Sequence, residues 1–149
     1  WIWYADKDNY PYRAIRPGGR KANPIKIKLH NVVANLMGLI LKEDETVDHI
    51  DTNPLNNQSN NIRAATKNQQ GQNRKTTSKR KVPFKGVKED RRGLFKFCIK
   101  NPETGKRETY SSFVTAEQAA KVYDEFARKY HGEFARLNFP KEGEQSARN

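Results

Sequence analysis

The 149-residue sequence contains only one cysteine, Cys98. A single cysteine excludes a disulfide within the chain and a zinc site built from several thiolates. Long apolar runs are also missing: no segment approaches the roughly 18 to 20 residues that span a membrane, and no apolar stretch follows a basic start as in a signal peptide. We therefore expect a soluble cytoplasmic protein. Because the sequence starts at Trp1 and not at a methionine, we also expect an upstream segment.

Acidic residues are in the minority. The 29 Lys and Arg outnumber the 17 Asp and Glu, which gives a net charge of +12 and a pI near 9.9. Such an excess of one sign is useful to a protein that binds a polyanion, with nucleic acid as the first candidate and an anionic membrane as the second. Hydrophobic residues make up only 34%, so two small modules fit the composition better than one large core.

The region before residue 31 predicts short β-strands. Residues 10–15 form one candidate strand, and the turn-rich segment 16–20 follows it. Apolar and basic side chains then alternate in the order Ile25, Lys26, Ile27, Lys28, Leu29 and His30. This alternation predicts a strand with one apolar and one basic face, and the basic face is either solvated or in contact with phosphate. For His30 we expect a structural role or a phosphate contact.

A helix is predicted from Asn31 to about Ile40. Its apolar residues recur at helical spacing, and they are Val32, Val33, Leu36, Met37 and Ile40. Asn31 is a suitable N-cap. A methionine within such a stripe usually belongs to a core, so we expect Met37 and its neighbours to be buried.

The most informative stretch runs from residue 46 to residue 74. Two short apolar runs, 47–50 and 62–65, flank a loop of Asn, Pro, Ser and Thr. This pattern predicts two strands joined by a long loop. Thr66 and Gln69 have the spacing of a capping box, which predicts a short helix directly after the second strand.

Asp48 and His49 are neighbours at the end of the first of these strands. Successive side chains of a strand point to opposite faces, so one can hold a cation while the other faces a substrate. A carboxylate is a ligand for a hard cation, and an imidazole that titrates near neutral pH suits a base that activates water. The pair therefore points to metal-assisted phosphodiester hydrolysis, although an isolated Asp-His pair is more often only surface polarity. Asn61 could orient the imidazole by accepting a hydrogen bond.

The segment VDHIDTNPLNNQSNNIRAAT, residues 47–66, resembles the core of the HNH nuclease family, in its phage and intron-encoded homing endonuclease branch. The resemblance implies a ββα-metal fold, double-stranded DNA as the substrate and one Mg²⁺ or Mn²⁺ per active site. Carried over to this chain, Asp48 corresponds to the metal-binding Asp, His49 to the general base and Asn61 to the central Asn that orients it. Asn57 matches a loop Asn whose role is structural.

One position departs from the family pattern. The family usually places a second metal ligand, His or Asn, nine residues after the central Asn, and this chain has Gln70 there. A Gln carbonyl oxygen is also a hard ligand, on a longer and more flexible stem. We take Gln70 as the second metal ligand, with Asn68 or Asn73 as alternatives and weak activity as a further possibility.

Residues 74–83 are basic and have almost no large apolar side chain. The cations are Arg74, Lys75, Lys79, Arg80 and Lys81. Such a segment cannot bury a core and predicts a linker. We expect it to lie along a nucleic-acid backbone or in the minor groove; a solvated, flexible tether is the alternative.

A second module is predicted from residue 84 to residue 140. Over 95–100 the apolar residues Phe95, Phe97 and Ile99 alternate with Lys96, Cys98 and Lys100. A turn at 101–105 and a strand at 108–113 follow, and Thr115 with Gln118 forms a capping box for a helix that ends at Gly132. Three strands under one helix give a small unit whose outer face is basic and exposed. Residues 141–149 are expected to be a frayed polar tail.

This module resembles the Apetala or ethylene-response-factor type of DNA-binding domain, along Lys85 to Pro140. The matching landmarks are KGVK at 85–88, SSFVTAEQAA at 111–120, VYD at 122–124 and GEFARLNFP at 132–140. The resemblance implies that the three-stranded sheet enters the major groove. The DNA-binding positions it implies, with the strand residue Lys96, are Lys85, Lys88, Arg92, Lys96, Lys100, Arg107 and Thr109. Lys lacks the bidentate fork of Arg, so the plant-type target site is not assumed.

The predicted fold class is α+β, with a ββα-metal nuclease module after a small sheet and helix, and a three-stranded antiparallel sheet packed on one helix. The predicted boundaries are 1–73 for the nuclease module, 74–83 for the basic linker, 84–140 for the DNA-binding domain and 141–149 for the tail. We expect a monomeric homing-type DNA endonuclease that nicks one strand, without an obligate protein partner. The alternative is a DNA-binding regulator with an inactive nuclease module; a non-specific RNA-binding protein fits less well, since the second module lacks an aromatic stacking platform.

Overall fold

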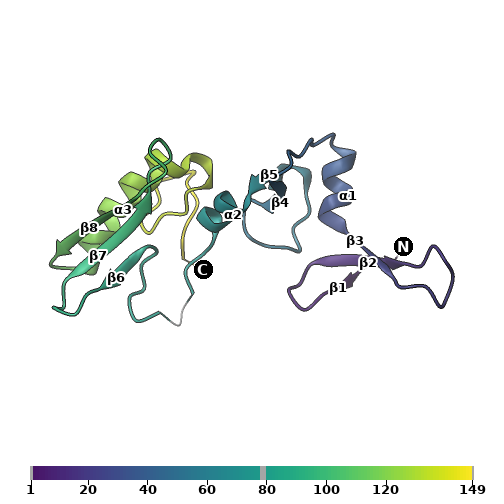
Figure 1. Cartoon of the computed structure of the whole chain (residues 1–149), viewed down its shortest axis with the longest axis horizontal. Helices are drawn as coiled ribbons and strands as arrows, with labels where there is room; N and C mark the ends of the chain where they lie inside the picture. The colour runs from purple at the N-terminus through teal and green to yellow at the C-terminus, as the bar shows by residue number, and fades with distance from the viewer. Residues whose placement is uncertain (1, 78–79, 149) are drawn as a thin grey trace. The chain divides into compact units, whose positions relative to one another are not determined.

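The computed structural model describes residues 2–77 and 80–148 and divides the chain into two compact units, Trp1–Gln70 (unit 1) and Gly71–Asn149 (unit 2). Both units combine small antiparallel sheets with helices, so the α+β class is confirmed (Figure 1). No helix within the described residues is both long and apolar enough to cross a membrane.

Unit 1 begins with a three-stranded antiparallel sheet followed by a helix. The strands are β1 (Tyr4–Ala5), β2 (Pro11–Ile15) and β3 (Ile25–Lys28), in the order β1-β2-β3. Helix α1 (Leu29–Leu36) follows β3 directly and contacts β2, β3, β4 and β5. Strands β2 and β3 correspond to the strands predicted at 10–15 and 25–30, but Leu29 and His30 belong to α1, so the predicted N-cap at Asn31 was wrong.

Helix α1 ends four residues before the predicted Ile40. Gly38 lies in the left-handed region, with φ of +72°, and the Leu39 N–H donates to the Ala34 carbonyl at 2.9 Å. These features form a C-terminal cap of the Schellman kind, which stops the helix. The predicted apolar stripe is therefore broken, and Leu36 and Ile40 are 81% and 87% exposed. Met37 is 44% exposed, so its assignment to the core was wrong.

The central part of unit 1 is a hairpin followed by a helix. Strands β4 (Glu45–His49) and β5 (Ile62–Thr66) pair antiparallel, and the one-turn 3₁₀ helix η1 (Ser59–Asn61) lies between them. Helix α2 (Lys67–Asn73) follows β5, and the boundary between the units falls within it. The predicted capping box is present, because the Thr66 N–H donates to Gln69 Oε1 at 2.8 Å and the Gln69 N–H donates to Thr66 Oγ1.

Unit 2 is a three-stranded antiparallel sheet covered by one helix (Figure 1). The strands are β6 (Val87–Glu89), β7 (Phe95–Lys100) and β8 (Arg107–Phe113), in the order β6-β7-β8. Helix α3 (Ala116–His131) starts at the predicted capping box of Thr115 and Gln118, and the one-turn helix η2 (Gly132–Phe134) follows it. Helix α3 packs on β7 most extensively, as the alternation of apolar residues in β7 predicts.

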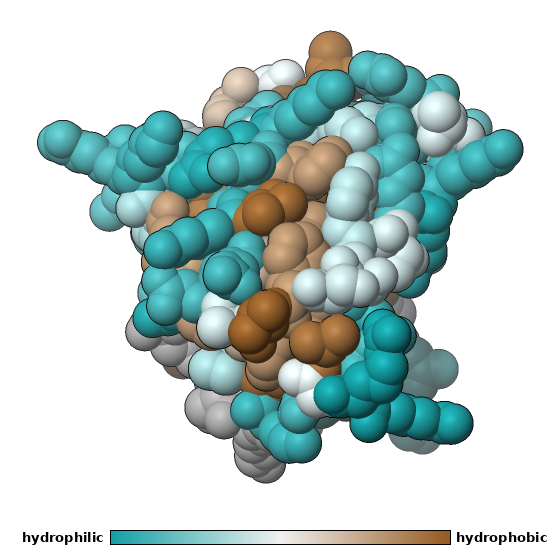
Figure 2. Space-filling model, turned by 90° about the vertical axis from the view of Figure 1, so that its left-hand side faces the viewer, coloured by the Kyte–Doolittle hydropathy of each residue, from teal (hydrophilic) through white to brown (hydrophobic). Residues whose placement is uncertain are grey.

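The core of unit 2 lies between α3 and the inner face of this sheet. Phe97 is 1% exposed, and its ring lies 4.9 Å from that of Tyr110 and 5.7 Å from that of Tyr123. Around this core the surface is mainly hydrophilic, with a narrow hydrophobic strip on the side seen in Figure 2.

The segments on either side of this core are more ordered than the sequence predicts. Val82, in the predicted linker, is a member of the core, and the Thr76 N–H donates to the Ala147 carbonyl at 2.8 Å. In the predicted tail Ala147 is fully buried and Arg128 pairs with Glu144 at 2.7 Å. The expectation of a frayed tail was therefore wrong, because apolar contacts and ion pairs join residues 141–148 to the unit.

Candidate functional site

His49, the candidate base, is the last residue of β4 and is 5% exposed. Its Nε2 lies 3.1 Å from Oδ1 of Asn57. The amide nitrogen of Asn57 donates to the carbonyls of Pro54 and Leu55, so its oxygen is the atom that faces the ring. An oxygen only accepts, and therefore Nε2 carries the proton and Nδ1 is the basic atom of the neutral imidazole.

Asn61 occupies a different place from the one predicted. Its Oδ1 accepts from the Asp51 N–H at 3.0 Å, and its Nδ2 donates to Asp51 Oδ1 at 2.9 Å and to the Asn56 carbonyl at 2.7 Å. The structure thus exchanges the expected roles: Asn57 contacts the imidazole, and Asn61 closes the loop that carries Asn57. Burial alone would raise the pKa of Asp51, but hydrogen bonds from Asn53, Asn56 and Asn61 hold it below its ordinary value.

Two aromatic side chains surround the His49 ring. The ring of His30, from α1, lies 5.3 Å away in an edge-to-face arrangement, and the ring of Tyr10 lies 5.9 Å away. His30 is 6% exposed, and burial, followed by the charges of His49 and Lys28, lowers its pKa to about 4. His30 is therefore neutral at pH 7 and adds no charge beside the base. This contact favours the structural role for His30.

Asp48, the candidate metal ligand, has a basic partner across the hairpin. Asp48 and Arg63 are paired in register, and Arg63 Nε lies 3.1 Å from Asp48 Oδ2, with both side chains about nine-tenths buried. Sequence reasoning did not single out Arg63. The signal for it was the hairpin itself, since pairing the strands from His49 and Ile62 places residue 63 opposite residue 48.

Gln70, the second candidate ligand, lies beside the same strand. Its Nε2 donates to Thr46 Oγ1 at 2.6 Å, which leaves the carbonyl oxygen as the ligand atom. Thr46 and Asp48 are two residues apart in β4 and therefore share one face. Two oxygen donors on one side of a hairpin fit a hard cation that draws its other ligands from water and phosphate. No cluster of three or more His, Cys, Asp or Glu side chains occurs among the described residues.

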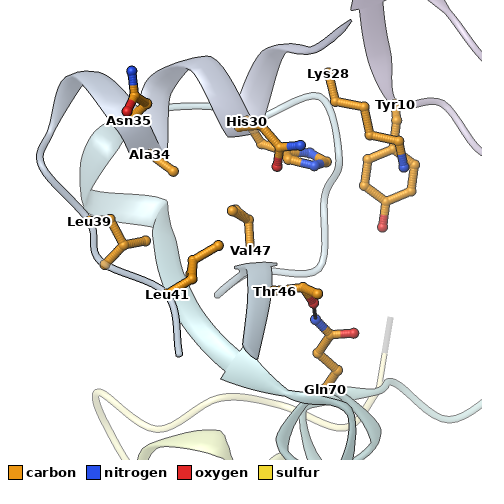
Figure 3. A pocket seen from close by; sticks show the side chains of 11 residues that line it. Tyr10, Lys28, His30, Ala34, Asn35, Leu39, Leu41, Thr46, Val47 and Gln70 are labelled. Atoms are coloured by element: carbon orange, nitrogen blue, oxygen red, sulfur yellow. Dashed lines mark hydrogen bonds between the residues drawn. The ribbon is translucent and has the colours of Figure 1, made fainter. Parts of the chain in front are cut away.

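A cavity of about 680 Å³ in unit 1 has Gln70 and Thr46 in its lining, whereas neither Asp48 nor His49 lines it. Figure 3 shows Gln70 and Thr46 on one side of it and His30, Lys28 and Tyr10 on another. Lys28 Nζ lies 4.5 Å from the centre of the Tyr10 ring, a distance suited to a cation–π contact. None of the described residues that line the cavity is acidic, so an anion could enter it without repulsion from its walls.

In unit 2, five of the predicted DNA-binding residues lie on the outer face of the sheet. Lys88 is paired with Lys96, and Lys100 is paired with Arg107. Thr109 lies opposite Cys98 on the same face. Like charges directly opposite each other destabilise a sheet, so these pairs are explained best by a polyanionic partner.

The remaining predicted cations do not lie together on the outer face of the sheet. Arg92 is 69% exposed on its side chain and pairs with Asp90 in the turn before β7, and Lys81 pairs with Glu89 at 2.8 Å. Lys79 lies outside the described residues. Arg74, Lys75, Arg80 and Lys85 line one cavity together with Arg107. Lys85 is not an exposed contact, because its ammonium group donates to the carbonyl of Gln72.

Comparison with known proteins places the hairpin of unit 1 in a family. Residues 27–72 match the model of the HNH endonuclease family. An uncharacterized HNH endonuclease of Acanthamoeba polyphaga mimivirus is 33% identical over 138 residues, which cover 91% of this chain and 66% of the viral protein. The chain therefore spans just under two thirds of that relative.

Shorter matches are to plant proteins. The dehydration-responsive element-binding protein 2A of Arabidopsis thaliana is 41% identical over 58 residues, 39% of this chain and 17% of the plant protein. The protein of the same name from Oryza sativa subsp. indica is 41% identical over 56 residues, 38% of this chain and 20% of the plant protein.

A solved structure of DNA binding and cleavage by the HNH homing endonuclease I-HmuI aligns with 87% of this chain and 74% of that chain, at 23% identity and a TM-score of 0.38. That similarity is too distant to assign side-chain roles. The family match, however, covers β4, β5 and nearly all of α2, where Asp48, His49, Asn61 and Gln70 lie. Residues 27–72 of this chain are therefore similar to the HNH endonuclease family.

Proposed function

We propose that the chain is a DNA endonuclease that hydrolyses phosphodiester bonds with the help of a divalent ion. The observation that carries this proposal is the bond from His49 Nε2 to Asn57 Oδ1 within the HNH module. It assigns the role of proton acceptor to Nδ1, on the residue that follows Asp48 in β4.

The chain's own residues supply three parts of the reaction. His49 accepts a proton from water at Nδ1, so that the oxygen of that water attacks the scissile phosphorus. Asn57 holds the ring in the required tautomer and shares the positive charge that forms on the imidazolium. Arg63, paired with Asp48, fixes the orientation of the carboxylate.

Asp48 and the carbonyl oxygen of Gln70 are the residues that would hold the ion. When bound, a divalent ion such as Mg²⁺ or Mn²⁺ polarises the phosphoryl group and stabilises the leaving oxygen. A cation that takes only one or two protein oxygens and completes its shell with water and phosphate matches the preference of Mg²⁺.

Unit 2 supports the same substrate. The cross-strand pairs Lys88–Lys96 and Lys100–Arg107 suit a DNA backbone. We infer that residues 84–140 form a DNA-binding domain of the Apetala or ethylene-response-factor type, which contacts the major groove through this sheet face. The plant matches, over 58 and 56 residues, support this, since Lys85 to Pro140 is a segment of 56 residues.

We further propose that the enzyme is of the homing type, acts in the cytoplasm of a host cell and nicks one DNA strand as a monomer. The supporting observation for nicking is the single Asp48-His49 pair per chain. Double-strand breaks made by a proven monomer would overturn that part.

The test is cleavage of supercoiled plasmid in Mg²⁺ or Mn²⁺ by the full chain. The parent protein should convert the plasmid to open circles, and His49→Ala should lower the rate by about 10²- to 10⁴-fold while DNA binding is unchanged. Arg20→Gln, on the exposed turn before β3, is the control and should cut like the parent. Cleavage by His49→Ala at the parental rate would contradict the proposal.

The second candidate is a DNA-binding regulator with an inactive HNH module. Two observations favour it: Gln70 replaces the usual ligand and is bonded to Thr46, and Asp48 is paired with Arg63. Gln70→Asn separates the two candidates. If neither the parent nor Gln70→Asn cuts DNA while both bind it tightly, the regulator is the correct function.

A further inference from the structure

We propose that a cavity in unit 2, of about 450 Å³, is a binding site for one phosphate group of the DNA backbone. Its lining brings together residues of the predicted linker and of the sheet, and those used below are Arg74, Lys75, Thr76, Arg80, Lys85 and Arg107. The inference rests on DNA being the substrate. It goes beyond that function because it gives the basic linker a defined place and a defined ligand.

The charge of the cavity is the first argument. Five of its lining residues are cations, and none of the described lining residues carries a carboxylate. Burial, followed by the charge of Arg136 and against the opposing charge of Asp124, lowers the pKa of Lys85 to about 8. Cations gathered in a cavity whose described lining has no carboxylate repel one another, and a phosphate would reduce that repulsion.

The second argument is that the cavity has fixed walls. Arg136 Nε donates to Asn73 Oδ1 at 3.0 Å, which holds the start of the linker. Thr76 N–H donates to the carbonyl of Ala147 at 2.8 Å and holds the next stretch. The backbone of Arg74 and Lys75 is therefore held at both ends, and this part of the linker does not have to be ordered when a ligand binds.

Gly86 forms the floor of the cavity against the ring of Tyr123. Its φ is +81°, and a Cβ at this position would lie 2.4 Å from a ring carbon of Tyr123. Only glycine fits there, so the backbone reaches the ring and the cavity stays open above it. Burial raises the pKa of Tyr123 to about 12, so this wall carries no negative charge at neutral pH.

The hydroxyl of Thr76 supplies a polar atom without a partner. Thr76 Oγ1 is buried and makes no hydrogen bond among the described residues. Buried hydroxyls are nearly always bonded, so an unpaired one in the wall of a cationic cavity indicates a missing acceptor. A phosphate oxygen is such an acceptor. Cations plus one hydroxyl donor match a phosphodiester better than a carboxylate, because the phosphate offers more oxygens in three dimensions.

The first experiment measures phosphate binding by the full chain in the absence of metal. Inorganic phosphate is titrated into ¹⁵N-labelled protein at low salt, and the amide signals of Thr76 and Gly86 are followed. The parent should show saturable shifts at these residues. The double substitution Arg74→Gln/Arg80→Gln should abolish them, whereas Arg91→Gln/Lys106→Gln, which removes the same charge from exposed positions outside the cavity, should not. No saturable shift in the parent overturns the proposal.

The second experiment measures affinity for a DNA duplex as a function of salt. Arg74→Gln/Arg80→Gln should lower affinity about tenfold and reduce the slope of log K against log salt by about 1, as the loss of one phosphate contact does. If this variant and the control bind DNA equally while the cavity still binds inorganic phosphate, the site takes free phosphate, and the DNA assignment is overturned.

The same double substitution that weakens binding should make the protein more stable to heat. Without phosphate at low salt, Arg74→Gln/Arg80→Gln should raise Tm by roughly 2 °C, because repulsion is relieved. Phosphate should raise the Tm of the parent and not of the variant. A purely structural role for the two arginines predicts a lower Tm for the variant, so a higher Tm excludes that role.

Thr76→Val, which removes only the unpartnered hydroxyl, should weaken phosphate binding without lowering Tm. An unchanged affinity for phosphate counts against the site.

These readouts are independent of cleavage. If the parent binds phosphate in the cavity and DNA with the expected salt dependence but does not cut, the nuclease proposal fails and the phosphate site stands. If the parent cuts DNA but Arg74→Gln/Arg80→Gln changes neither phosphate nor DNA binding, the site fails and the nuclease stands.

Discussion

The two units of this chain differ in what fills their centres. Within the described residues of unit 1, the buried apolar side chains are Ala34, Ile62 and Ala65, and they lie beside the buried polar residues His30, His49 and Asn61. Unit 2 buries a continuous cluster around Phe97, Tyr123 and Leu137. Apolar packing therefore stabilises unit 2, whereas hydrogen bonds and ring contacts contribute more to the stability of unit 1.

The largest effect that tests this comparison is expected from Phe97→Ala. Phe97 is 1% exposed and contacts Tyr110, Phe113 and Tyr123, so its truncation should destabilise unit 2 by about 3–5 kcal/mol. Both tryptophans of the sequence lie within the first three residues, so their fluorescence reports unit 1. The amides of unit 2 should lose protection from hydrogen exchange at lower urea concentrations than in the parent. The urea midpoint measured by tryptophan fluorescence should not change. A shift of both the exchange protection and the tryptophan midpoint would mean that the units unfold together. The control is Val114→Ala, at a 71% exposed position.

The next largest effect is expected from acid. In unit 1 the pKa of His30 is lowered by burial and then by His49 and Lys28, against a small opposing effect of Asp6. Its value of about 4, against an ordinary 6.5, means that the unfolded chain binds a proton that the folded chain does not. Stability should therefore fall as pH drops from about 6.5 to 4, by about 3 kcal/mol at most.

Urea midpoints measured at pH 7 and pH 4.5 check this expectation. His131 of unit 2 has a pKa lowered to about 4 as well, by burial and then by Lys85, so both units should lose stability. His30→Asn should remove part of the pH dependence from the tryptophan transition only. An unchanged pH profile in that variant would assign the loss to other groups.

A smaller effect should separate the two asparagines of the HNH loop. Asn61→Ala removes one of the hydrogen bonds to the Asp51 carboxylate, together with the bonds that Asn61 makes to the Asp51 N–H and the Asn56 carbonyl, and should cost about 1–3 kcal/mol of stability. Asn57→Ala leaves that network intact but frees the His49 ring, and should lower single-turnover cleavage about 10- to 100-fold with little change in stability. If the two variants behave alike, the exchange of roles between Asn57 and Asn61 is wrong.

The smallest effect concerns the end of helix α1. Leu36→Ser and Ile40→Ser should change the unfolding free energy by less than about 0.5 kcal/mol, since both side chains are more than four-fifths exposed. Thermal unfolding measures this directly, with Ile62→Ala at a 4% exposed position as the contrast. A large loss in Leu36→Ser would show that this face is covered in solution.

Much of the fold could be predicted because local signals are strong in this chain. The capping boxes at Thr66 and Thr115 set the starts of α2 and α3, and alternation over 95–100 set the inner face of β7. Helix α1 was extended too far because periodicity carries no information about the left-handed turn at Gly38. A fold with few large buried side chains in unit 1 cannot cover every apolar stripe.

The candidate site was predictable in its composition but not in its contacts. The motif predicted Asp48 and His49 as site residues. It did not predict which asparagine, Asn57 or Asn61, contacts the His49 ring, because that depends on the conformation of the loop. Asn57 is selected because its amide nitrogen is held by the carbonyls of Pro54 and Leu55. Arg63 and Tyr10 were missed because their proximity depends on strand pairing and on long-range packing.

The order of the C-terminal residues has a practical consequence for anyone who dissects the chain. Ala147 has no exposed surface, and residues 137 and 146 form a parallel bridge. A fragment cut at Pro140, the boundary predicted from the sequence, would uncover Leu137 and remove the carboxylate partner of Arg128. Such a fragment should aggregate during purification. The aggregation would then be attributed to poor solubility of the domain, although its cause is a boundary drawn from homology alone.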